Sequence, residues 1–559
     1  LLLQLEKYKE GLEFIKIAID NYPENLKIRN NYAVLLYNCG FKKECLDIYK
    51  DFDEQKIHFT DSYINYSRIL YLNKSYEDAL FIINSLIFED DKNIIALRHR
   101  FLIYKEINEL NKAEQDILSA YKLNNNDIST NKTIVEFYLD TKNFDKAIPY
   151  CDFMISKNIE KSFFLMAKIT CKIHLGLWNG LLGELNLFEN KIDDQIIFRP
   201  LALRYFNDNA ELQKKNAENY WFQRLKTKQY QRIKKNFSEN KINNKIKIGY
   251  VSGDFRKHAV FNLIQDLFFY HDKSIFEIYA YSLFKQEGPE REKVLRNVDF
   301  FYDIDNKSND EIVKLIQSHS LDVAIDLAGF TMLGKPEIFN SDIAKIKINY
   351  LGYPGTMGTK SYDYIIADEI IIPEKHKKFY SEKVLYLKEN YQPFTPVSFE
   401  NDFDRSIFNL PRDGFILGCM SRIEKILPNI FNIWMEIMKK HLDTYLALYT
   451  GDAKVKNNIK NYCDENNFDF ERIIFLDHIN HVDNLKRISL FDLYLDTFPY
   501  NGHTGISDSL FQACVPTISF SGNSFASRVS MSLLSSLNLK NLITTSEQEY
   551  KKKIENYCS

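Results

Sequence analysis

The sequence predicts an array of paired α-helices followed by two α/β domains, each built on a parallel sheet. Three observations carry this prediction. Certain residues recur at a fixed interval through the first third of the 559-residue chain. At residue 245 the pattern changes to alternating strands and helices. This alternation stops at residues 391–404 and then begins again, which indicates two α/β domains rather than one.

Small or compact residues mark the repeat. They stand 34 residues apart, at Gly11, Cys45, Ala79, Ala113 and Ala147. Seven residues after each of them comes an apolar side chain: Ala18, Phe52, Leu86, Ala120 and Met154. This period and pattern resemble tetratricopeptide repeats, in which each repeat is a pair of helices. One pair cannot bury its own apolar face, so we expect the repeats to stack into a superhelix with a concave groove. Such a groove is either a docking surface for protein segments or part of a helical array without a ligand.

The repeat fades near Asn186. Residues 209–240 then predict one long, polar-faced helix, and the pair at 243–244 marks a junction. We therefore expect helical repeats over 1–185 and linking helices over 186–243. The first α/β domain is expected over 244–395 and the second over 396–559, with the second cut short at its end.

Short apolar runs place the strands of these domains. We expect them at 245–251, 276–283, 321–327, 346–351 and 364–367, and then at 415–420, 445–449, 473–476, 491–495 and 515–520. Helical patterns lie between them, such as 261–270, 310–319 and 429–439. This order predicts parallel sheets with helices on both faces. Ligands of such sheets bind beyond the carboxyl ends of the strands.

Composition excludes several classes of protein. The net charge of −3 argues against binding to nucleic acid through bulk charge. The eight cysteines contain no Cys-x-x-Cys pair, which favours a reducing compartment and no structural zinc. No apolar run is long enough to span a bilayer. We therefore expect a cytoplasmic protein without a membrane span and without a nucleic-acid partner.

One polar stretch, residues 495–508, stands between a predicted buried strand at 490–495 and a predicted short helix at 509–514. Free backbone N–H groups and the helix dipole make such a place an anion site. Thr504 and Ser507 add hydroxyl groups, and His503 can donate when its ring is suitably protonated. Asp508 suits a sugar hydroxyl better than an anion. The stretch is therefore either a site for a nucleotide diphosphate or an ordinary capped helix.

Three further polar loops follow predicted strands. In 252–258, Asp254 and His258 stand close enough for joint acid–base chemistry, although such a pair is often structural. In 351–358, glycines such as Gly355 allow close approach of a ligand or simply form a tight turn. In 419–425, Arg422 or Lys425 is placed to neutralise a diphosphate, unless these are ordinary surface cations.

Taken together, these stretches resemble the O-GlcNAc transferase family, which includes Spindly-type protein O-fucosyltransferases and bacterial relatives. The motifs that carry the resemblance are GYVSGDF at 249–255 with His258 after it, LGYPGT at 351–356, RIIF at 472–475, LDTFPYNGHT at 495–504 and SFASR at 524–528. The resemblance covers nearly the whole chain. It implies tetratricopeptide repeats followed by a two-domain GT-B glycosyltransferase, in a form without the insertion of animal enzymes.

The resemblance also implies roles by position. Lys425 corresponds to the diphosphate-binding lysine, and Asp508 to the ribose-binding aspartate. His503 and Thr504 correspond to the pair that contacts the phosphates. The implied catalytic residues are His258, Asp254 and Lys425. The implied donor-binding residues are Gly355, Thr356, Arg422, Lys425, His503, Thr504 and Asp508.

The chain departs from the family pattern in two places. Gly505 stands where the family often has a second threonine after His-Thr, so one hydroxyl donor is lost. In the loop after 472–475, animal enzymes place a lysine and a histidine around the uracil, and this chain has His481 and Asn484 there. The identity of the donor's nucleobase, and therefore of its sugar, stays open.

We expect inverting transfer of a sugar, GlcNAc first among the candidates, from a nucleotide-diphosphate donor such as UDP-GlcNAc to Ser or Thr hydroxyls of proteins bound along the repeat groove. Lys425, His503 and Thr504 would stabilise the charge of the leaving diphosphate without a metal or cofactor. The Asp-x-Asp sequence at 402–404 lies in an irregular stretch and is expected to be solvated.

The group that takes the acceptor proton is open between His258, Asp254 and a donor phosphate oxygen. Other activities also remain open. They are transfer of fucose or glucose, transfer to Asn, action on a glycan or small molecule, and a repeat scaffold whose catalytic half is silent.

Overall fold

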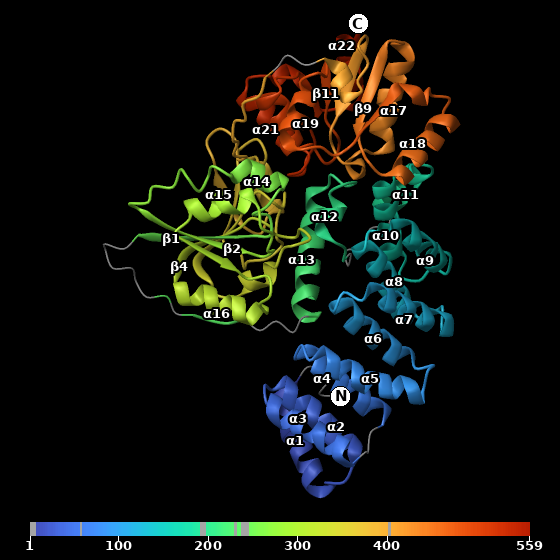
Figure 1. The fold of residues 1–559 in the computed structure, drawn as a ribbon, viewed down its shortest axis with the longest axis vertical. Helices are drawn as coiled ribbons and strands as arrows, with labels where there is room; N and C mark the ends of the chain where they lie inside the picture. Colours follow the sequence, from blue (N-terminus) through green and yellow to red (C-terminus); the bar gives the residue numbers. More distant parts are fainter. Residues whose placement is uncertain are drawn as a thin grey trace. The chain divides into compact units, whose positions relative to one another are not determined.

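The computed structural model describes residues 7–55, 59–190, 197–227, 232–235, 237, 245–400 and 404–559. It divides into two compact units, Leu1–Phe164 and Leu165–Ser559, each described by itself below (Figure 1). No helix among the described residues is long and apolar enough to cross a membrane.

The first unit is a run of helix pairs. They are α1 (Tyr8–Asn21) with α2 (Leu26–Asn38), α3 (Lys42–Gln55) with α4 (Thr60–Leu72), α5 (Tyr76–Glu89) with α6 (Ile94–Glu106), and α7 (Leu110–Leu123) with α8 (Ile128–Asp140), followed by α9 (Phe144–Ser156). The first helices of the pairs begin at residues 8, 42, 76, 110 and 144, so the 34-residue period of the sequence is confirmed in the helix boundaries.

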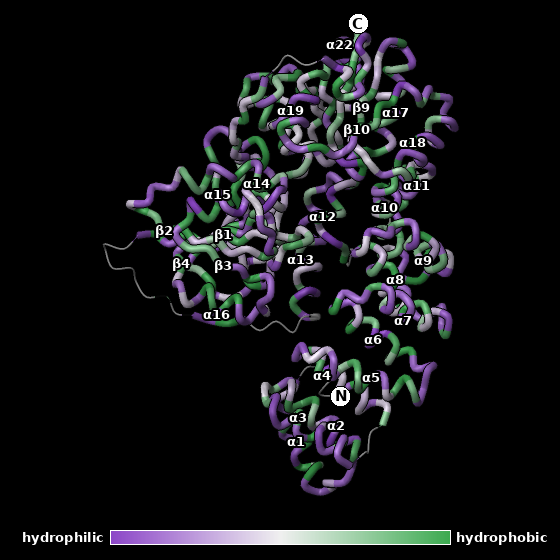
Figure 2. The backbone as a smooth tube through the Cα atoms, in the orientation of Figure 1, coloured by the Kyte–Doolittle hydropathy of each residue, from purple (hydrophilic) through white to green (hydrophobic). Residues whose placement is uncertain are grey.

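Local sequence explains these boundaries. Asn25, Asn93 and Asp127 precede second helices, and each side chain accepts a hydrogen bond from a backbone N–H of the first turn. The compact residues Cys45 and Ala79, which mark the repeat, are fully buried and let neighbouring helices approach. Figure 2 shows hydrophilic and hydrophobic residues alternating along these helices, as expected for elements with one buried face.

The linking segment follows α10 (Lys161–Leu175). It contains α11 (Leu181–Asn190), α12 (Pro200–Leu203) and α13 (Ala210–Thr227). The helix predicted over 209–240 is confirmed for α13, but it is wrong at 232–235, which are not helical. Residues 228–231, 236 and 238–244, which include the predicted junction at 243–244, lie outside the described residues.

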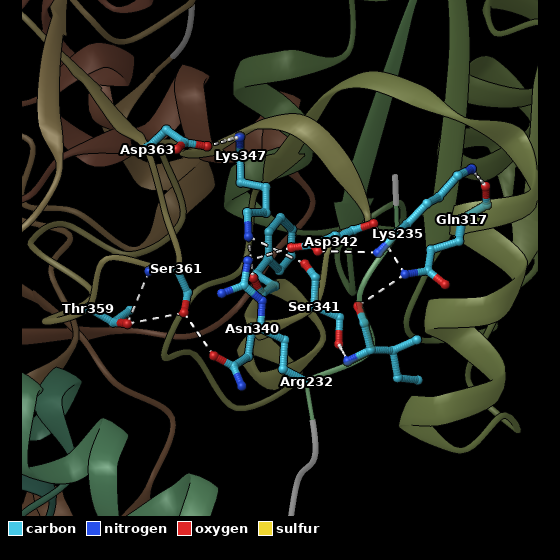
Figure 3. A network of polar contacts seen from close by, with 12 residues as sticks. Arg232, Lys235, Gln317, Asn340, Ser341, Asp342, Lys347, Thr359, Ser361 and Asp363 are labelled. Carbon is cyan, nitrogen blue, oxygen red and sulfur yellow. Dashed lines mark hydrogen bonds and ion pairs between the residues drawn. The ribbon is translucent and has the colours of Figure 1, made fainter. Parts of the chain in front are cut away.

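Tertiary hydrogen bonds explain why 232–235 is not helical (Figure 3). The backbone N–H of Ile233 donates to Ser341 Oγ at 2.9 Å, and that of Lys235 donates to Asp342 Oδ2 at 3.2 Å. The Lys235 ammonium donates to the carbonyl oxygen of Gln317. A helix would use these N–H groups internally, so partners more than eighty residues away in the sequence override the local helical pattern.

The first α/β domain holds a seven-stranded parallel sheet in the order β3-β2-β1-β4-β5-β6-β7. Its strands are β1 (Ile246–Ser252), β2 (Phe276–Ser282), β3 (Phe300–Asp303), β4 (Leu321–Asp326), β5 (Ala344–Asn349), β6 (Tyr364–Ala367) and β7 (Lys383–Tyr386). Helices α14 (Ala259–Ile264) and α15 (Pro289–Asn297) lie on one side of it and α16 (Asn309–His319) on the other (Figure 1).

The second α/β domain holds a six-stranded parallel sheet in the order β10-β9-β8-β11-β12-β13. Its strands are β8 (Phe415–Cys419), β9 (Thr444–Tyr449), β10 (Ile473–Leu476), β11 (Leu493–Leu495), β12 (Thr517–Phe520) and β13 (Ile543–Thr544). Its helices include α17 (Pro428–Lys440), α18 (Ala453–Glu465), α19 (His481–Ile488), α21 (Val529–Ser536) and α22 (Glu547–Cys558).

The predicted fold class, helical repeats followed by two Rossmann-like domains, is therefore confirmed. Every predicted strand is present within a few residues, but β3, β7 and β13 were not predicted. These strands have two to four residues each, and β3, β7 and β13 are outer strands of their sheets. Short, half-exposed outer strands carry little apolar sequence signal.

The linking segment packs on both α/β domains. Trp178 lies against Phe431 of α17 and Tyr462 of α18, with ring centroids 4.5 and 5.3 Å apart. Arg204 Nε donates to the carbonyl oxygen of Pro354 in the first domain at 2.8 Å. The linking segment therefore contacts residues of both α/β domains.

Candidate active site

The polar loops predicted from the sequence follow the carboxyl ends of β1, β5, β8 and β11. Strand order reverses beside β1 in one sheet and beside β8 in the other, since β1 lies next to β4 and β8 next to β11. Such switch points are where parallel sheets bind ligands, because the connections on either side run to opposite faces and leave a crevice.

Lys425 and Asn501 meet because β8 and β11 are neighbouring strands. The Lys425 Nζ atom donates to the carbonyl oxygen of Asn501 at 2.7 Å and lies 3.8 Å from the ring centroid of Tyr500. Burial lowers the pKa of Lys425 to about 8, while the carboxylate of Asp496 acts in the opposite direction. The ammonium group is therefore mostly charged at neutral pH, and it faces a ring and a carbonyl rather than a paired carboxylate.

Asp496 shapes the loop that carries Asn501. Its carboxylate accepts hydrogen bonds from Thr497 N at 2.8 Å, Gly502 N at 2.7 Å and Ser519 Oγ at 2.7 Å, and its side chain is fully buried. Burial raises the pKa of Asp496. These bonds fold residues 496–502 back over the end of β12, and the chain leaves this loop directly into the helix that starts at Thr504.

The helix after this loop begins earlier than predicted. Helix α20 (Thr504–Ser507) continues without a break as a π-helical turn, Asp508–Gln512, so the helix predicted at 509–514 starts five residues sooner. His503, with a φ of 46°, turns the chain into the helix. As a result, Thr504 and Asp508 are helical residues, one turn apart, rather than loop residues.

His503 is held in one tautomer. Its Nε2–H donates to the carbonyl oxygen of Ala526 at 3.1 Å. Burial, with the nearby charge of Lys425, places the pKa of His503 well below the ordinary value. The ring is therefore neutral with an unprotonated Nδ1, and it can donate to a phosphate only when the negative charge of that phosphate favours protonation at Nδ1.

The two predicted hydroxyl donors of this helix have different surroundings. Thr504 is half-buried in the first turn, and its hydroxyl forms no hydrogen bond with any residue the structure describes. The Ser507 oxygen instead accepts a hydrogen bond from Gln392 Nε2 and is buried. Thr504 is thus the hydroxyl available to an anion at the helix start, whereas Ser507 is held against the segment that joins the two α/β domains.

Asp508 contacts His481, one of the two residues that the resemblance places beside the nucleobase of the donor. Its Oδ1 atom lies 3.2 Å from Nε2 of His481, the first residue of α19. Farther along α19, Asn484 Oδ1 accepts from Arg487 Nη2 at 2.6 Å, and Arg487 is buried. The three predicted nucleoside-side residues, His481, Asn484 and Asp508, therefore lie on two elements in contact.

Arg422 is the most exposed of the predicted donor-binding residues. Its side chain is 70% exposed, and its Nη1 atom lies 3.8 Å from Glu424 Oε1. Its positive charge contributes to lowering the pKa of both Lys425 and His258. Arg422 is therefore close to residues of both α/β domains.

Asp254 and His258 form the predicted pair. His258 Nδ1 lies 3.4 Å from Asp254 Oδ2, and Asp254 Oδ1 accepts from Arg256 Nη2 at 3.2 Å. His258 caps α14, because its Nδ1 accepts from the backbone N–H of Val260 at 3.2 Å. Burial lowers the pKa of His258, an effect that Asp254 opposes and that Arg256 and Arg422 increase. The ring is therefore neutral at pH 7, with its proton on Nε2 in this geometry.

Gly355 and Thr356 are enclosed. The Thr356 hydroxyl donates to Glu382 Oε2 at 2.6 Å and accepts from the backbone N–H groups of Gly358 and Ser381, each at 3.1 Å. All three hydrogen-bonding positions of this buried hydroxyl are thus occupied. A Cβ atom on Gly355 would lie 1.7 Å from Arg204 Nη2. A role of these two residues in donor binding stays a prediction.

Two residues of the linking segment support the site but were not predicted from the sequence. Tyr205 stacks on Tyr500, with ring centroids 5.2 Å apart, and so lies behind the ring that contacts Lys425. Asp208 accepts from Asn523 N at 2.7 Å and Ser524 N at 2.9 Å, which fixes the loop whose Ala526 carbonyl holds His503. Their partners lie about three hundred residues away, so no local pattern reveals them.

Among the residues that the structure describes, no three His, Cys, Asp or Glu side chains gather closely enough to hold a metal ion. Of the Asp-x-Asp sequence at 402–404, the first two residues lie outside the described part of the chain. Asp404 caps a 3-10 helix (Arg405–Phe408), with Ser406 N donating to its Oδ1 at 2.7 Å. No metal role is assigned to it.

Comparisons with known proteins agree with this architecture. In structure, the chain is similar to a mutant of Thermobaculum terrenum O-GlcNAc transferase, with a TM-score of 0.62 and 19% identity over 89% of each chain. In sequence, it is 31% identical over 325 residues to the probable UDP-N-acetylglucosamine–peptide N-acetylglucosaminyltransferase SEC of Arabidopsis thaliana, which is 55% of this chain and 32% of that protein.

A second relative is the probable UDP-N-acetylglucosamine–peptide N-acetylglucosaminyltransferase SPINDLY of Petunia hybrida. It is 27% identical over 365 residues, 63% of this chain and 38% of that protein. The matches therefore span about a third of the length of these relatives. The model of Glycosyl transferase family 41 matches residues 212–394 and 403–558, more than half of the chain. The chain belongs to glycosyl transferase family 41.

Proposed function

We propose that this chain is a protein glycosyltransferase that moves a sugar, GlcNAc, from a nucleotide-diphosphate sugar to Ser or Thr hydroxyls. One observation carries the proposal. The ammonium group of Lys425 is bound to the carbonyl of Asn501, three residues before the helix that begins at Thr504. A cation and the first turn of a helix therefore converge on one place, which suits a diphosphate.

The relatives support the choice of sugar and acceptor. Both are named as probable UDP-N-acetylglucosamine–peptide N-acetylglucosaminyltransferases. The pairing of Asp508 with His481 supports a nucleoside beside the diphosphate, because an aspartate next to a phosphate site is better suited to a ribose hydroxyl than to an anion.

In the proposed reaction, the bond between the anomeric carbon and the diphosphate oxygen breaks as the acceptor oxygen attacks from the opposite face. The negative charge that develops on the diphosphate would be stabilised by Lys425, by the Thr504 hydroxyl and by the start of α20. His503 would add a donor once the diphosphate raises its pKa enough to protonate Nδ1. We assign this stabilisation to the chain's own residues, without a metal.

The acceptor hydroxyl must also lose its proton. In the present geometry, Nδ1 of His258 accepts a hydrogen bond from Val260 N, so the ring proton is on Nε2. Nε2 therefore cannot accept a second proton. If the ring instead carries its proton on Nδ1, this N–H donates a hydrogen bond to Asp254 Oδ2, 3.4 Å away, in place of the hydrogen bond that Nδ1 accepts from Val260 N, and Nε2 becomes a base. We therefore propose His258 as the base and Asp254 as the residue that selects its tautomer.

The acceptor is proposed to be a polypeptide, bound along the concave groove that stacked helical repeats form. Cytoplasmic location is proposed as well. The thiols of Cys45, Cys419 and Cys463 are free and buried, which suits a reducing compartment.

Mass spectrometry of acceptor proteins tests the proposal. The protein is incubated with a protein extract and, separately, with UDP-GlcNAc, UDP-glucose or GDP-fucose. We expect one sugar residue to be added to peptides from the UDP-GlcNAc reaction and to be lost on β-elimination, as an O-linked sugar is. Transfer from GDP-fucose only, or a sugar on Asn that survives β-elimination, would replace the proposal by the corresponding alternative.

A further inference from the structure

Tyr494 is a residue of β11 whose side chain reaches both elements that form the proposed diphosphate site. Its hydroxyl oxygen accepts a hydrogen bond at 3.2 Å from the backbone N–H of Met420, the residue that follows β8. The same oxygen would lie 2.9 Å from a Cβ atom added to Gly505, in the first turn of α20. One hydroxyl group therefore lies between the loop that carries Lys425 and the helix that begins at Thr504.

The hydrogen bond to Met420 holds the start of the loop that carries Lys425. The backbone pairing of the parallel strands β8 and β11 includes Gly418 opposite Tyr494. Two residues after Gly418, the N–H of Met420 donates to the side-chain hydroxyl of Tyr494. The phenol thus extends the contact between the two strands beyond their backbone pairing, to the point where residues 420–425 begin.

Gly505 is explained by the same hydroxyl group. Its backbone is helical and does not have the positive φ that favours glycine. Glycine is less favourable than alanine in a helix, so the conformation gives no reason for it. Outside the helix backbone and the two chain neighbours, the only described atoms within 4 Å of a Cβ there belong to Tyr494, namely the hydroxyl oxygen at 2.9 Å and Cζ at 4.0 Å. Glycine at 505 therefore makes room for the Tyr494 hydroxyl.

The Tyr494 side chain has no room to move away from this contact. The residue is fully buried, and its backbone N–H donates to the carbonyl oxygen of Pro516 at 2.8 Å. Burial raises the pKa of Tyr494 well above its ordinary value, so the hydroxyl stays neutral. A side chain added at 505 would have to push back a packed ring or the helix itself, because protein interiors leave few voids.

We propose that Tyr494 is a positioning residue for the donor diphosphate, which sets the separation between the loop that carries Lys425 and helix α20. Its hydroxyl holds Met420 on one side and limits the approach of the helix at Gly505 on the other. Lys425 and Thr504 can bind one diphosphate only when this separation is right. Tyr494 acts through them, since it is itself fully buried. The inference rests on the proposed transferase function.

A double-mutant cycle tests the proposal, with the affinity for UDP measured by isothermal titration calorimetry on the full chain. Gly505→Ala should weaken UDP binding about fivefold or more, because its Cβ meets the Tyr494 hydroxyl. Tyr494→Phe should weaken it about two- to tenfold, because Met420 loses its acceptor. In the Tyr494→Phe background the obstructing oxygen is gone, so Gly505→Ala should cost less than about twofold.

Two variants separate positioning from general stability. Gly183→Ala also places alanine at a helical glycine, but a Cβ there has no neighbouring atom within 4 Å, so UDP affinity should not change. Tyr462→Phe removes another hydroxyl of the same domain, which donates to Asn432 Oδ1 at 2.9 Å. It should lower the melting temperature and leave UDP affinity unchanged, whereas a purely structural Tyr494 would give this same result in Tyr494→Phe.

Unchanged UDP affinity in Gly505→Ala would overturn the proposal, and this single variant decides the matter if Tyr494→Phe does not fold. Equal losses from Gly505→Ala in both backgrounds would overturn it too. Lys425→Ala separates this failure from that of the proposed function. UDP binding that does not depend on Lys425 would overturn both, whereas Lys425-dependent binding with an additive cycle would overturn only the role of Tyr494.

Discussion

The Nε2 atom of His481 lies 3.2 Å from the Oδ1 atom of Asp508, and this contact joins α19 to the helix that begins at the proposed phosphate site. One carboxylate oxygen of Asp508 is therefore engaged by the protein. The other oxygen, Oδ2, forms no hydrogen bond with any residue that the structure describes, so we expect it to be the oxygen that a ligand uses. Asp508 follows Thr504 by one helical turn, so a nucleoside attached to the proposed diphosphate can reach this carboxylate.

We expect Asp508→Ala to weaken UDP binding by about 10- to 100-fold, because a hydrogen bond to a charged group contributes roughly 1.5–3 kcal/mol. Binding of inorganic pyrophosphate, which has no ribose, should be unchanged. Isothermal titration calorimetry with both ligands measures the two effects. An equal loss of pyrophosphate affinity would show that Asp508 supports the phosphate site instead.

We expect the affinity for UDP to depend on pH through the charge of Lys425. Burial lowers the pKa of Lys425 to about 8, so its charged fraction is nearly constant below that pH and falls as the pH rises above it. A bound diphosphate favours the charged form. UDP affinity should therefore decrease by up to about tenfold per pH unit above pH 8, until the pKa of the complex is reached.

Lys425→Arg supplies the control for this pH dependence, because a guanidinium group stays charged across this range. The affinity of this variant for UDP should be flat from neutral pH to well above pH 8. If the wild-type protein and Lys425→Arg weaken in parallel with pH, a group other than Lys425 controls binding.

Asp254 should affect transfer and not donor binding. Asp254→Asn removes the carboxylate that would accept a hydrogen bond from Nδ1–H of His258, so kcat should fall by about 100-fold or more, with the Kd for UDP unchanged. The rate should also fall on acidification through the pKa of His258, which burial lowers below its ordinary value. Because Asp254 raises that pKa, the acid limb of the variant should move to lower pH. An unchanged profile in Asp254→Asn would assign the base to the donor phosphate.

Gly355 is expected to matter for stability. A Cβ atom there would lie 1.7 Å from Nη2 of Arg204, whose guanidinium group is buried and lies 4.4 Å from the ring centroid of Tyr353. Gly355→Ala should lower the free energy of unfolding by about 1–3 kcal/mol or more, as overpacking does. Differential scanning calorimetry measures this.

Gly183→Ala is the matched control for this substitution. Gly183 lies in α11, and a Cβ atom added there would have no neighbouring atom within 4 Å. Alanine there should be neutral or stabilising, because it favours helix over glycine. A Gly355→Ala variant as stable as Gly183→Ala would contradict this prediction and show that the Arg204 side chain moves aside at little cost in stability.

The sequence revealed the features that depend on local or periodic patterns. The spacing of Cys45, Ala79 and Ala113 predicted the helix pairs, because each compact residue fills the same place in successive repeats. Apolar runs predicted every strand except β3, β7 and β13, and the polar residues that follow several of them fell at the carboxyl ends of parallel strands. Lys425 and the 495–508 stretch were brought together in this way, by neighbouring strands β8 and β11.

Features that depend on distant partners could not be predicted. From the sequence, Thr356 is an ordinary threonine in a glycine-rich loop, and only the fold shows that its hydroxyl donates a hydrogen bond to Glu382. Likewise, the sequence at 232–235 predicts a helix, but hydrogen bonds to Ser341 and Asp342 hold these residues in a non-helical conformation. Tyr205 and Asp208 lie in a segment without periodicity, so their roles beside Tyr500 and the 523–527 loop become visible only in the fold.

The measurement that tests the central claim most directly is release of UDP from UDP-GlcNAc with and without acceptor protein, in the wild type and in Lys425→Ala. We expect release that depends on acceptor protein and falls by at least about 100-fold in Lys425→Ala, since the leaving diphosphate loses a charged hydrogen-bond donor. Lys377→Ala, which changes a lysine already paired with Glu374, should behave like the wild type. Acceptor-dependent release that is unaffected by Lys425→Ala would contradict the assigned diphosphate site. No release from this donor, GDP-fucose or UDP-glucose would contradict transferase activity and favour a repeat scaffold.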